Sequence, residues 1–327
     1  MRILITGGNG FIAKHLAQHI IDLRRSVQDI EIFLSFREGK NCEFGHGPNH
    51  NVNSVIMDLN DRESVLGTIA EVDPDKIFHL AGASSVSSSW KAPNLLFRSN
   101  LEGTLNLLEG VRNLSSSSTY VQIAGSSEEY GLVEECDLPI REDKQLLRPL
   151  SPYAVSKIGS DMLGHQYAHS YGLNILRTRT FNQTGPGRGE MYADSNFAKQ
   201  IALIENDLKP PTIDHGNLEA VRDFTDVRDT VRAYWKLSEL RWRGDVVNVC
   251  SGTGRKLEET LDILISKSSR KDIALHPDPR RQRPSDVPFS FGSNQKLKSF
   301  IDWNPKIPYE QSLEDLLEYW RSKVGSS

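Results

Sequence analysis

The chain has 327 residues, of which 38% are hydrophobic and 25% are charged, and its formal net charge is -4 at pH 7. A chain of this length can bury a core for one large or two interleaved domains. The slight acidic excess gives no general attraction for nucleic acid or an anionic membrane, so a polyanionic ligand needs a local cluster of basic residues. No apolar run is long enough to cross a bilayer, and no basic-then-apolar leader opens the chain.

The chain contains three cysteines, Cys42, Cys136 and Cys250. Their odd number and their spacing fit neither a disulfide framework nor a metal site, so we expect reduced thiols and a cytoplasmic protein. His165 and His169 have the spacing of zinc ligands on a helix, but no glutamate follows His165 and no third ligand is evident. We therefore expect no metal.

Short apolar runs alternate with helical patterns through the first half of the chain. The predicted strands are residues 2–6, 30–36, 54–57, 76–81 and 119–124, and the predicted helices are residues 11–24, 60–71 and 99–113. This alternation is typical of an α/β protein with a doubly wound parallel sheet and helices on both faces.

The second half changes character after a further strand at residues 174–180. Pro- and Gly-rich segments separate shorter helices, and the apolar run at 245–250 predicts a strand that rejoins the main sheet. We expect a Rossmann domain of residues 1–181 plus about 222–250. A smaller C-terminal substrate-binding lobe would comprise about 182–221 and 251–327. Near the chain end, Leu313, Leu316, Leu317 and Trp320 form an apolar stripe that predicts a helix packed on the rest of the protein.

The first predicted strand is followed by a Gly-x-x-Gly-x-x-Ala pattern that begins at Gly7. Gly7 suits a tight turn, and Gly10 lets the main chain approach a pyrophosphate at the start of the next helix. Ala13 replaces the usual third glycine without preventing helix-to-strand packing. The alternative is a glycine-rich turn that binds no phosphate.

The end of the second predicted strand indicates which dinucleotide is bound. A protein that prefers NAD usually has an acidic residue there, whereas this chain has Ser35 and Arg37. A hydroxyl and a guanidinium suit the 2′-phosphate of NADP, although Arg37 could also be an ordinary surface residue. Asp58 and Leu59, after the third strand, fit an adenine contact.

Ser151 to Lys157 form the second informative segment. Ser151 is a good N-cap and Pro152 suits the first helical position, so Tyr153 and Lys157 lie one turn apart on the same helix face. An ammonium beside a phenol favours the phenolate and lowers the phenol pKa, which lets Tyr153 exchange a proton near neutral pH. The same spacing recurs at Tyr319, where surface packing is the simpler interpretation.

These segments resemble the extended short-chain dehydrogenase/reductase family. The resemblance is carried by TGGNGFIA at 6–13, HLAG at 79–82, AGSSEEYG at 124–131 and YAVSK at 153–157. Further blocks resemble the GDP-4-keto-6-deoxy-D-mannose reductases, which are relatives of the GDP-mannose 4,6-dehydratases. They are FNQTGPG at 181–187, NFAKQIA at 196–202, GNLEAVRDFTDVRD at 216–229, VVNVCSGTG at 246–254 and RQRPSDVP at 281–288.

The resemblance implies reduction of a 4-keto GDP-sugar by NADPH. It implies that Ser126 binds the sugar 4-oxygen, Tyr153 donates the proton, and Lys157 holds the nicotinamide ribose while tuning Tyr153. Glu128 matches the acid/base residue of the dehydratases, and it could equally be a retained structural acceptor.

The resemblance also implies two sets of binding residues. The cofactor-binding set is Gly7, Asn9, Gly10, Phe11, Ile12, Ser35, Arg37, Asp58, Leu59, Leu80, Ala81, Gly82, Asn100, Tyr153 and Lys157, with Asn100 as a buried structural or water-binding amide. The substrate-binding set is Ser85, Ser126, Asn182, Lys199, Arg222 and Arg283. Without the resemblance, Arg222 could be a structural ion-pair partner and Arg283 part of a solvated basic run.

The sequence therefore predicts an NADPH-dependent reductase that gives GDP-D-rhamnose, works in the cytoplasm and forms a homodimer, with no nucleic-acid or membrane partner. A reductase that gives GDP-6-deoxy-D-talose and a GDP-mannose 4,6-dehydratase are the nearest alternatives. A binding or sensing protein without turnover is the alternative from another class, and the set Ser126, Tyr153 and Lys157 argues against it.

Overall fold

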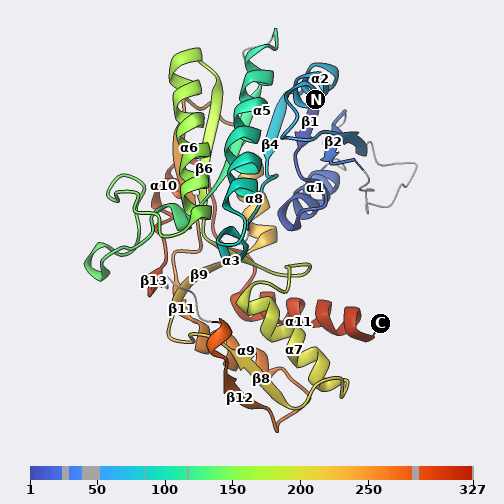
Figure 1. Ribbon diagram of the computed structural model, residues 1–327, viewed down its shortest axis with the longest axis vertical. Helices are drawn as coiled ribbons and strands as arrows, with labels where there is room; N and C mark the ends of the chain where they lie inside the picture. The colour runs from blue at the N-terminus through green and yellow to red at the C-terminus, as the bar shows by residue number, and fades with distance from the viewer. Residues whose placement is uncertain (24–28, 39–51, 85, 116–117, 282–286, 326–327) are drawn as a thin grey trace. The chain divides into compact units, whose positions relative to one another are not determined.

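The computed structural model describes residues 1–23, 29–38, 52–84, 86–115, 118–281 and 287–325 (Figure 1). The chain divides into two compact units. The first comprises Met1–Gly131, Leu146–Thr180 and Val231–Asn248, and the second comprises Leu132–Gln145, Phe181–Thr230 and Val249–Ser327. Within the described ranges, no helix has both the length and the apolar character that crossing a bilayer requires.

The first unit is built on a seven-stranded sheet with the order β10-β6-β5-β4-β1-β2-β3. Its strands are β1 (Arg2–Ile5), β2 (Glu31–Phe36), β3 (Val52–Ile56), β4 (Lys76–His79), β5 (Tyr120–Ser126), β6 (Asn174–Thr180) and β10 (Asp245–Val249). Neighbouring strands from β3 to β6 pair in parallel. The order of the first six strands is that of a Rossmann fold, so the predicted doubly wound parallel sheet is confirmed, as is the return of residues 245–249 to it.

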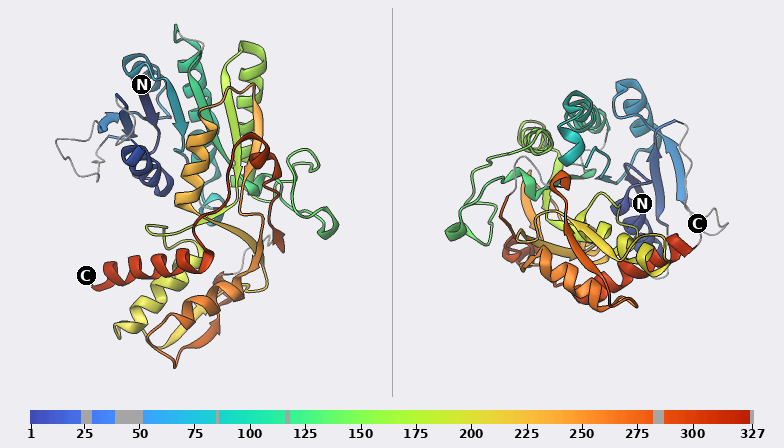
Figure 2. Two further views of the ribbon diagram at one scale, coloured as in Figure 1. Left: turned by 180° about the vertical axis from the view of Figure 1, so that it is seen from behind. Right: turned by 60° about the horizontal axis from the view of Figure 1, so that its bottom comes forward.

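Helices cover both faces of this sheet. The helical elements of the unit are α1 (Phe11–Leu23), α2 (Arg62–Val72), α3 (Val86–Ser89), α4 (Pro93–Phe97), the π-helix η1 (Arg98–Glu102), α5 (Gly103–Arg112), the 3₁₀ turn η2 (Ser127–Glu129), α6 (Pro152–Tyr171) and α8 (Val227–Leu237). Helices α5 and α6 lie on the face turned to the viewer in Figure 1, and α1 and α8 come forward in the view from behind in Figure 2. Buried side chains of α2, α5 and α6, among them Ile69, Leu107 and Tyr167, form one core cluster with the sheet.

The second unit contains two small sheets. Its strands are β7 (Asn182–Thr184), β8 (Thr212–His215), β9 (Val221–Asp226), β11 (Gly254–Lys256), β12 (Ala274–Pro277) and β13 (Phe289–Ser290). Its helical elements are η3 (Glu135–Asp137), α7 (Ala193–Glu205), α9 (Leu257–Ser266), η4 (Pro279–Arg281), α10 (Gln295–Phe300) and α11 (Tyr309–Gly325). Strand β9 pairs with β7, β11 and β13, and β8 pairs with β12.

Helix α11 packs as the apolar stripe predicts. Leu313, Leu316 and Leu317 are completely buried in a cluster with side chains of α7 and α9, and Trp320 packs against that cluster. The core of the second unit therefore depends on the last helix of the chain.

The predicted domains stay a prediction, and the compact units depart from their bounds mainly in two segments. Residues 222–230 belong to the second unit, because β9 pairs there in antiparallel fashion with β11 and in parallel with β7 and β13. Residues 132–145 also belong to it, and the N–H of Ile140 donates a hydrogen bond to the carbonyl of Phe291 at 3.0 Å. Both pairings join segments far apart in the sequence, which composition and periodicity do not reveal.

Replacing Leu316 by alanine leaves a cavity in the core of the second unit, since this side chain is completely buried. We expect the free energy of unfolding to fall by about 2–5 kcal/mol. Leu208→Ala is the matched control because Leu208 is 65% exposed, and its change should stay within about 0.5 kcal/mol. Urea denaturation followed by circular dichroism measures both values, and equal midpoints for the two variants would contradict the assigned packing of α11.

Candidate functional site

A tight turn follows β1, and its backbone requires glycine. Gly7 has a φ of 74°, and a Cβ atom built on it would lie 3.0 Å from the Cα atom of Ala81. The N–H of Gly8 donates to the carbonyl of Ser35 at 2.9 Å, and the N–H of Gly10 donates to the carbonyl of Gly7 at 2.7 Å. The turn is thereby fixed against the residues at the ends of β2 and β4.

The start of α1 offers main-chain groups to a ligand. Gly10 is exposed, and a Cβ atom on it would lie 2.9 Å from the Gly7 carbonyl oxygen, so only glycine leaves this turn uncrowded. The first amides of a helix lack partners within the helix, and the helix dipole favours an anion beside them. The turn therefore fits a pyrophosphate. Contacts of Asn9, Phe11 and Ile12 with a cofactor stay predictions.

The two predicted cofactor-binding residues at the end of β2, Ser35 and Arg37, differ in burial. The Ser35 side chain is buried, and its hydroxyl oxygen accepts a hydrogen bond from the Gly7 N–H at 3.3 Å. In this structure the hydroxyl therefore supports the glycine turn. The Arg37 side chain is exposed, and its contact with a 2′-phosphate stays a prediction.

A chain of hydrogen bonds that the sequence interpretation missed runs through the end of β4. The Thr104 hydroxyl donates to the carbonyl of Asn100 at 2.6 Å, so it must accept from Nε2–H of His79, 3.1 Å away. Nδ1 of His79 then accepts from the Thr6 hydroxyl at 3.0 Å, and that hydroxyl oxygen accepts from the Ala81 N–H at 2.9 Å. This chain fixes a neutral tautomer of His79 and ties the main chain after β4 to the end of β1.

The electrostatics agree with a neutral imidazole. Burial of His79, together with the ammonium of Lys157, lowers the pKa of His79 to about 3. The imidazole is therefore uncharged at any pH at which the protein operates, and it acts as a fixed hydrogen-bonding spacer. Within the HLAG block the histidine was visible in the sequence, but its partners Thr6 and Thr104 are distant in the chain.

Asn100 joins the loop after β4 to α6. Its side-chain oxygen accepts from the Ala83 N–H at 2.8 Å, and its Nδ2 donates to the Ala83 carbonyl at 3.1 Å and to the Ser156 hydroxyl at 3.0 Å. The residue lies in the π-helix η1, a type of distortion that often marks functional sites. A Cβ atom on Gly82 would come within 2.8 Å of the Asn100 side-chain oxygen. This buried amide therefore joins the loop after β4 to α6, and its place in the cofactor site stays a prediction.

The remaining predicted contacts with a dinucleotide lie after β3 and β4. Asp58 is half-buried, and its carboxylate accepts a hydrogen bond from the Asn60 N–H at 3.0 Å. Leu59 is buried, and Leu80 is half-buried. All three lie at the carboxyl edge of the sheet, and their contacts with adenine or ribose stay predictions.

Ser126 is the last residue of β5 and the N-cap of η2. Its hydroxyl oxygen accepts a hydrogen bond from the Glu128 N–H at 3.2 Å, and the Glu129 side chain accepts one from the Ser126 N–H at 2.7 Å. This reciprocal pair is a capping box, which fixes Ser126 once through its side chain and once through its main chain. Ser126 is 8% exposed and Glu128 is half-buried.

Helix α6 presents Tyr153 and Lys157 as predicted from its cap. The Ser151 hydroxyl oxygen accepts from the Ala154 N–H at 3.1 Å, and Pro152 is the first helical residue. The Lys157 ammonium donates to the carbonyl of Ala124 in β5 at 2.8 Å, and burial lowers the pKa of Lys157. The helix is thus fastened to the strand that ends in Ser126.

The described residues predicted for the diphosphate of the substrate belong to the second unit. Asn182 is in β7 and is half-buried. Lys199 of α7 forms an ion pair with Glu190, and Nη1 of Arg222 in β9 donates to the carbonyl of Val221 at 2.9 Å. Their contacts with a substrate stay predictions. Ser85 and Arg283 lie outside the described residues.

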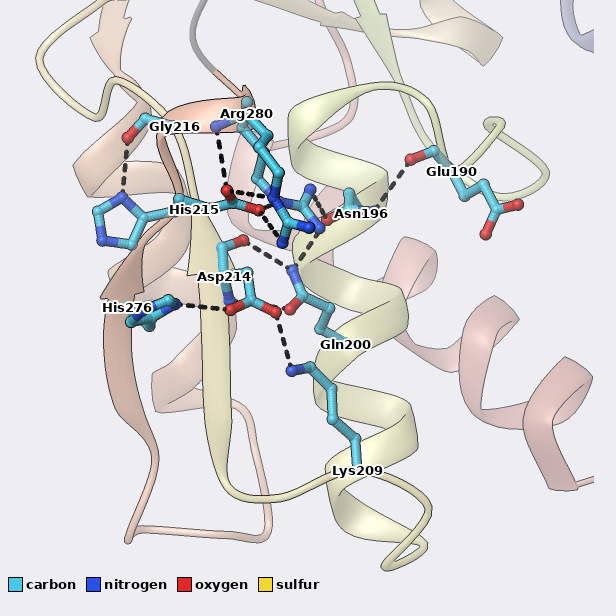
Figure 3. A network of polar contacts seen from close by, with 11 residues as sticks. Glu190, Asn196, Gln200, Lys209, Asp214, His215, Gly216, His276 and Arg280 are labelled. Carbon is cyan, nitrogen blue, oxygen red and sulfur yellow. Dashed lines mark hydrogen bonds and ion pairs between the residues drawn. The ribbon is translucent and has the colours of Figure 1, made fainter.

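A polar network braces the helix that carries Lys199 (Figure 3). Gln200 of α7 exchanges two hydrogen bonds with the main chain of Asp214 in β8, at 3.0 and 2.9 Å. The Asn196 side chain accepts from Nη1 of Arg281 at 2.8 Å, and the Asp214 carboxylate accepts from Lys209 at 3.0 Å. These contacts fix α7 against β8 and η4, so the position of Lys199 is set by a rigid element.

The two histidines with zinc-like spacing have structural partners. The rings of His165 and His169 lie against each other with centroids 4.1 Å apart and planes tilted by 39°, and Nδ1 of His169 bonds to the carbonyl of His165. In the part of the chain that the structure describes, no group of three or more His, Cys, Asp or Glu residues is arranged to hold a metal ion.

Comparison with known proteins identifies the family. The sequence model of the family described as GDP-mannose 4,6 dehydratase matches residues 4–316. The chain belongs to this family. It is 31% identical over 323 residues to the GDP-6-deoxy-D-mannose reductase of Pseudomonas aeruginosa, covering 99% of this chain and 98% of that protein. It is 27% identical to the GDP-mannose 4,6-dehydratase of Yersinia enterocolitica, covering 97% and 92%.

Solved structures agree with this assignment. The structure of RMD from Pseudomonas aeruginosa complexed with NADPH matches with a TM-score of 0.83 and 30% identity, covering 99% of this chain and 100% of that one. The UDP-glucose 4-epimerase of Thermus thermophilus in complex with NAD matches with a TM-score of 0.82 and 29% identity, covering 98% and 99%. The predicted resemblance to extended short-chain dehydrogenases/reductases is therefore confirmed.

Proposed function

We propose that this protein reduces the 4-keto group of GDP-4-keto-6-deoxy-D-mannose with NADPH and gives GDP-D-rhamnose. The observation that carries the proposal is the fastening of Lys157 to β5, two residues before Ser126, by its hydrogen bond to Ala124. A reductase needs this arrangement of proton donor, ammonium and hydroxyl at a strand end, whereas a binding protein does not. The full-length similarity to a GDP-6-deoxy-D-mannose reductase supports the choice of substrate.

The glycine turn fits the pyrophosphate of NADPH, since it leads into α1, whose first amides favour an anion, and a Cβ atom on Gly7 or Gly10 would crowd the turn itself. Arg37 would bind the 2′-phosphate by its planar guanidinium, and Asp58 and Leu59 would contact the adenosine. When bound, NADPH supplies the hydride that reduces the keto carbon.

The residues of the chain then supply orientation and a proton. The Ser126 hydroxyl would donate to the keto oxygen, where negative charge develops during reduction. Tyr153 would transfer its phenolic proton to that oxygen, which completes the alcohol, and the adjacent Lys157 ammonium would stabilise the phenolate left behind. One ketone, one hydride and one proton give one alcohol, so one NADPH is oxidised to NADP for each product formed.

The second unit carries the residues that we assign to the GDP group. Lys199 and Arg222 would neutralise the diphosphate, because a protein with a net negative charge needs local basic residues to bind an anion. Asn182 would donate a hydrogen bond to the diphosphate. Ser85 and Arg283 complete the assigned set on the strength of the family resemblance alone.

A direct assay tests this function. The protein is incubated with GDP-4-keto-6-deoxymannose and NADPH, the absorbance of the reduced cofactor is followed, and the sugar product is identified by NMR. We expect one NADPH consumed per GDP-D-rhamnose. If the product is GDP-6-deoxy-D-talose, the protein is a reductase but the proposed stereochemistry of the product is wrong. Conversion of GDP-mannose without net NADPH consumption would establish the dehydratase, in which Glu128 acts as acid/base. Loss of neither substrate nor NADPH would refute both activities.

Replacing Tyr153 by phenylalanine removes the proposed proton donor, and we expect kcat to fall about 10²- to 10⁴-fold. NADPH affinity should stay within about twofold, since the ring is kept. Tyr319→Phe is the matched control, because Tyr319 has the same spacing to Lys323 on α11 and packs against that lysine. Stopped-flow absorbance gives kcat for each variant, and undiminished turnover in Tyr153→Phe would end the proposed mechanism.

Replacing Gly7 by alanine forces a side chain into the turn at a φ of 74°. We expect the Kd for NADPH to rise about 10-fold or more, because either the turn or the cofactor must move. Gly172→Ala is the control: its φ is 69°, but no atom lies within 4 Å of the added Cβ. That variant should lose stability while its NADPH affinity, measured by fluorescence titration, stays unchanged. An equal change of NADPH affinity in Gly7→Ala and Gly172→Ala would count against the assignment of the glycine turn to the pyrophosphate.

We also propose that the protein forms a homodimer in the cytoplasm. Three large apolar side chains on α5 and α6 support the dimer: Leu105, Val155 and Met162 are 38%, 43% and 41% exposed. Val155 and Met162 are seven residues apart on α6 and therefore share a face. Met162→Glu should convert the dimer to a monomer in size-exclusion chromatography with light scattering, whereas Met191→Glu, at a 61% exposed residue of the second unit, should not. A monomeric wild type would refute the proposal.

A further inference from the structure

Four buried charged side chains form a cluster directly behind Ser126. They are Glu129, Asp161, Arg177 and Arg179, and none of them is more than 6% exposed. Two carboxylates and two guanidinium groups give a cluster with no net formal charge. Neither the sequence interpretation nor the proposed mechanism gives this cluster a role.

Arg179 links the two carboxylates of the cluster. Its Nε donates to Oε2 of Glu129 at 2.9 Å, and its Nη2 donates to Oδ2 of Asp161 at 2.7 Å. The same oxygen of Asp161 accepts from Nη1 of Arg177 at 2.9 Å, and Nε of Arg177 donates to the carbonyl of Gly244 at 2.9 Å. The cluster is therefore anchored in β6, α6 and the loop before β10, and Arg179 is its member that binds Glu129.

The free oxygen of Glu129 reaches the main chain at the predicted catalytic serine. Oε1 accepts a hydrogen bond from the N–H of Ser126 at 2.7 Å. A Cβ atom on Gly125 would lie only 2.4 Å from that oxygen, so the preceding residue must be glycine for the carboxylate to approach. The hydrogen bond between Glu129 and the Ser126 N–H thus depends on the glycine at position 125 as well as on the arginine that holds Glu129.

The charge of Glu129 also acts on the predicted catalytic lysine. Burial lowers the pKa of Lys157, and the carboxylate of Glu129 is the group that opposes this by raising it. An opposite charge nearby favours the ammonium form of a desolvated lysine. Glu129 therefore influences both Ser126 and Lys157 without a place in the proposed chemistry.

We propose that Glu129, held by Arg179, is a positioning residue that fixes the Ser126 main chain for the reduction. The effect of its charge on Lys157 is the electrostatic part of this role. This inference rests on the proposed function, because it assigns a purpose to the neighbours of the residues that would perform it. A general gain in stability is a poor explanation for the cluster, since buried ion pairs are often no more stabilising than apolar side chains of similar size.

Several charged groups face this site, and together they determine its pH dependence. Asp161 and Lys157 belong to α6, Arg177 and Arg179 to β6, and His79 to β4, and Tyr130 lies against Arg179. Burial and Asp161 raise the pKa of Glu129 to about 7, against the opposing effects of Arg179 and the Ser126 N–H. His79 contributes no charge near neutral pH.

Two substitutions distinguish the effect of the Glu129 charge from the effect of its side-chain length, which brings the carboxylate to the Ser126 N–H. Glu129→Gln keeps an oxygen in place for the Ser126 N–H but removes the charge. Glu129→Asp keeps the charge but shortens the side chain by one methylene, which withdraws it from Ser126. Glu205→Gln is the matched control, because Glu205 is also a buried partner of an arginine, Arg321, and also accepts a main-chain N–H, that of Ser269 at 2.8 Å.

The pH profile of Glu129→Gln tests the effect of the charge. Without the carboxylate, the pKa of Lys157 falls further, so the ammonium is lost at a lower pH and the alkaline limb of the kcat profile should move to lower pH. A wild-type profile in Glu129→Gln would overturn the electrostatic part of the proposal.

The kinetic constants and amide exchange of Glu129→Asp test the effect of reach. We expect kcat to fall about 10- to 100-fold with KM within about twofold, because a displaced catalytic group costs turnover more than binding. Glu205→Gln should keep the kcat of the wild type even if its melting temperature falls. Equal kcat in Glu129→Asp and the wild type, or an equal loss in Glu205→Gln, would overturn the positioning role.

Hydrogen exchange separates this inference from the proposed function. Measured by mass spectrometry on NADPH-free protein, the amides of residues 124–131 should exchange at least about 10-fold faster in Glu129→Asp than in the wild type or in Glu205→Gln. This readout needs no substrate, so it decides whether Glu129 fixes the Ser126 main chain even if the wild type proves inactive toward GDP-4-keto-6-deoxymannose. Unchanged exchange would overturn the inference, whereas an inactive wild type would overturn only the proposed function.

Discussion

The desolvated ammonium of Lys157 is the constraint on which the arrangement of the first unit depends. A lysine in this half-buried position loses hydration, and burial lowers its pKa. The carbonyl of Ala124 and the charge of Glu129 compensate for part of that loss. The same ammonium disfavours a second positive charge nearby, which agrees with the neutral state of His79. This cation thereby adds to the effect of burial in lowering the pKa of His79 on β4.

At the carboxyl edge of the sheet, buried side chains form hydrogen bonds with main-chain groups of the loops. These bonds fix the loops in place. Thr6 accepts from the Ala81 N–H, Asn100 binds both polar main-chain groups of Ala83, and Glu129 accepts from the Ser126 N–H. Each of these side chains is buried, so each bond is protected from competition with water. The loops that follow β4 and β5 are therefore held by fixed partners, as preorganised binding and catalysis require.

Much of this arrangement could be predicted from the sequence because the signals are local. The glycine turn, the cap at Ser151 and the spacing of Tyr153 to Lys157 each lie within a few residues, and the parallel sheet follows from the alternation of elements. Partners that meet only through the fold were not predictable: Arg179 reaches Glu129 across 50 residues, and Thr6 reaches His79 across 73. The hydrogen bond that the Ser35 hydroxyl accepts from the turn after β1 was not predictable for the same reason, and the contact of Ser35 with a cofactor stays a prediction.

Glu128 and Glu129 are adjacent acids with different environments, and this difference bears on the choice between reduction and dehydration. Glu129 is completely buried and both of its oxygens have protein partners, so neither oxygen is accessible to a sugar. Glu128 is half-buried, and its N–H holds the Ser126 hydroxyl oxygen. A dehydratase needs a second acid/base beside the tyrosine to remove water, whereas a reductase needs only the one proton donor and an external hydride. Of the two acids, only Glu128 is available for the additional step, so the product formed at this site depends on whether its carboxylate meets the sugar.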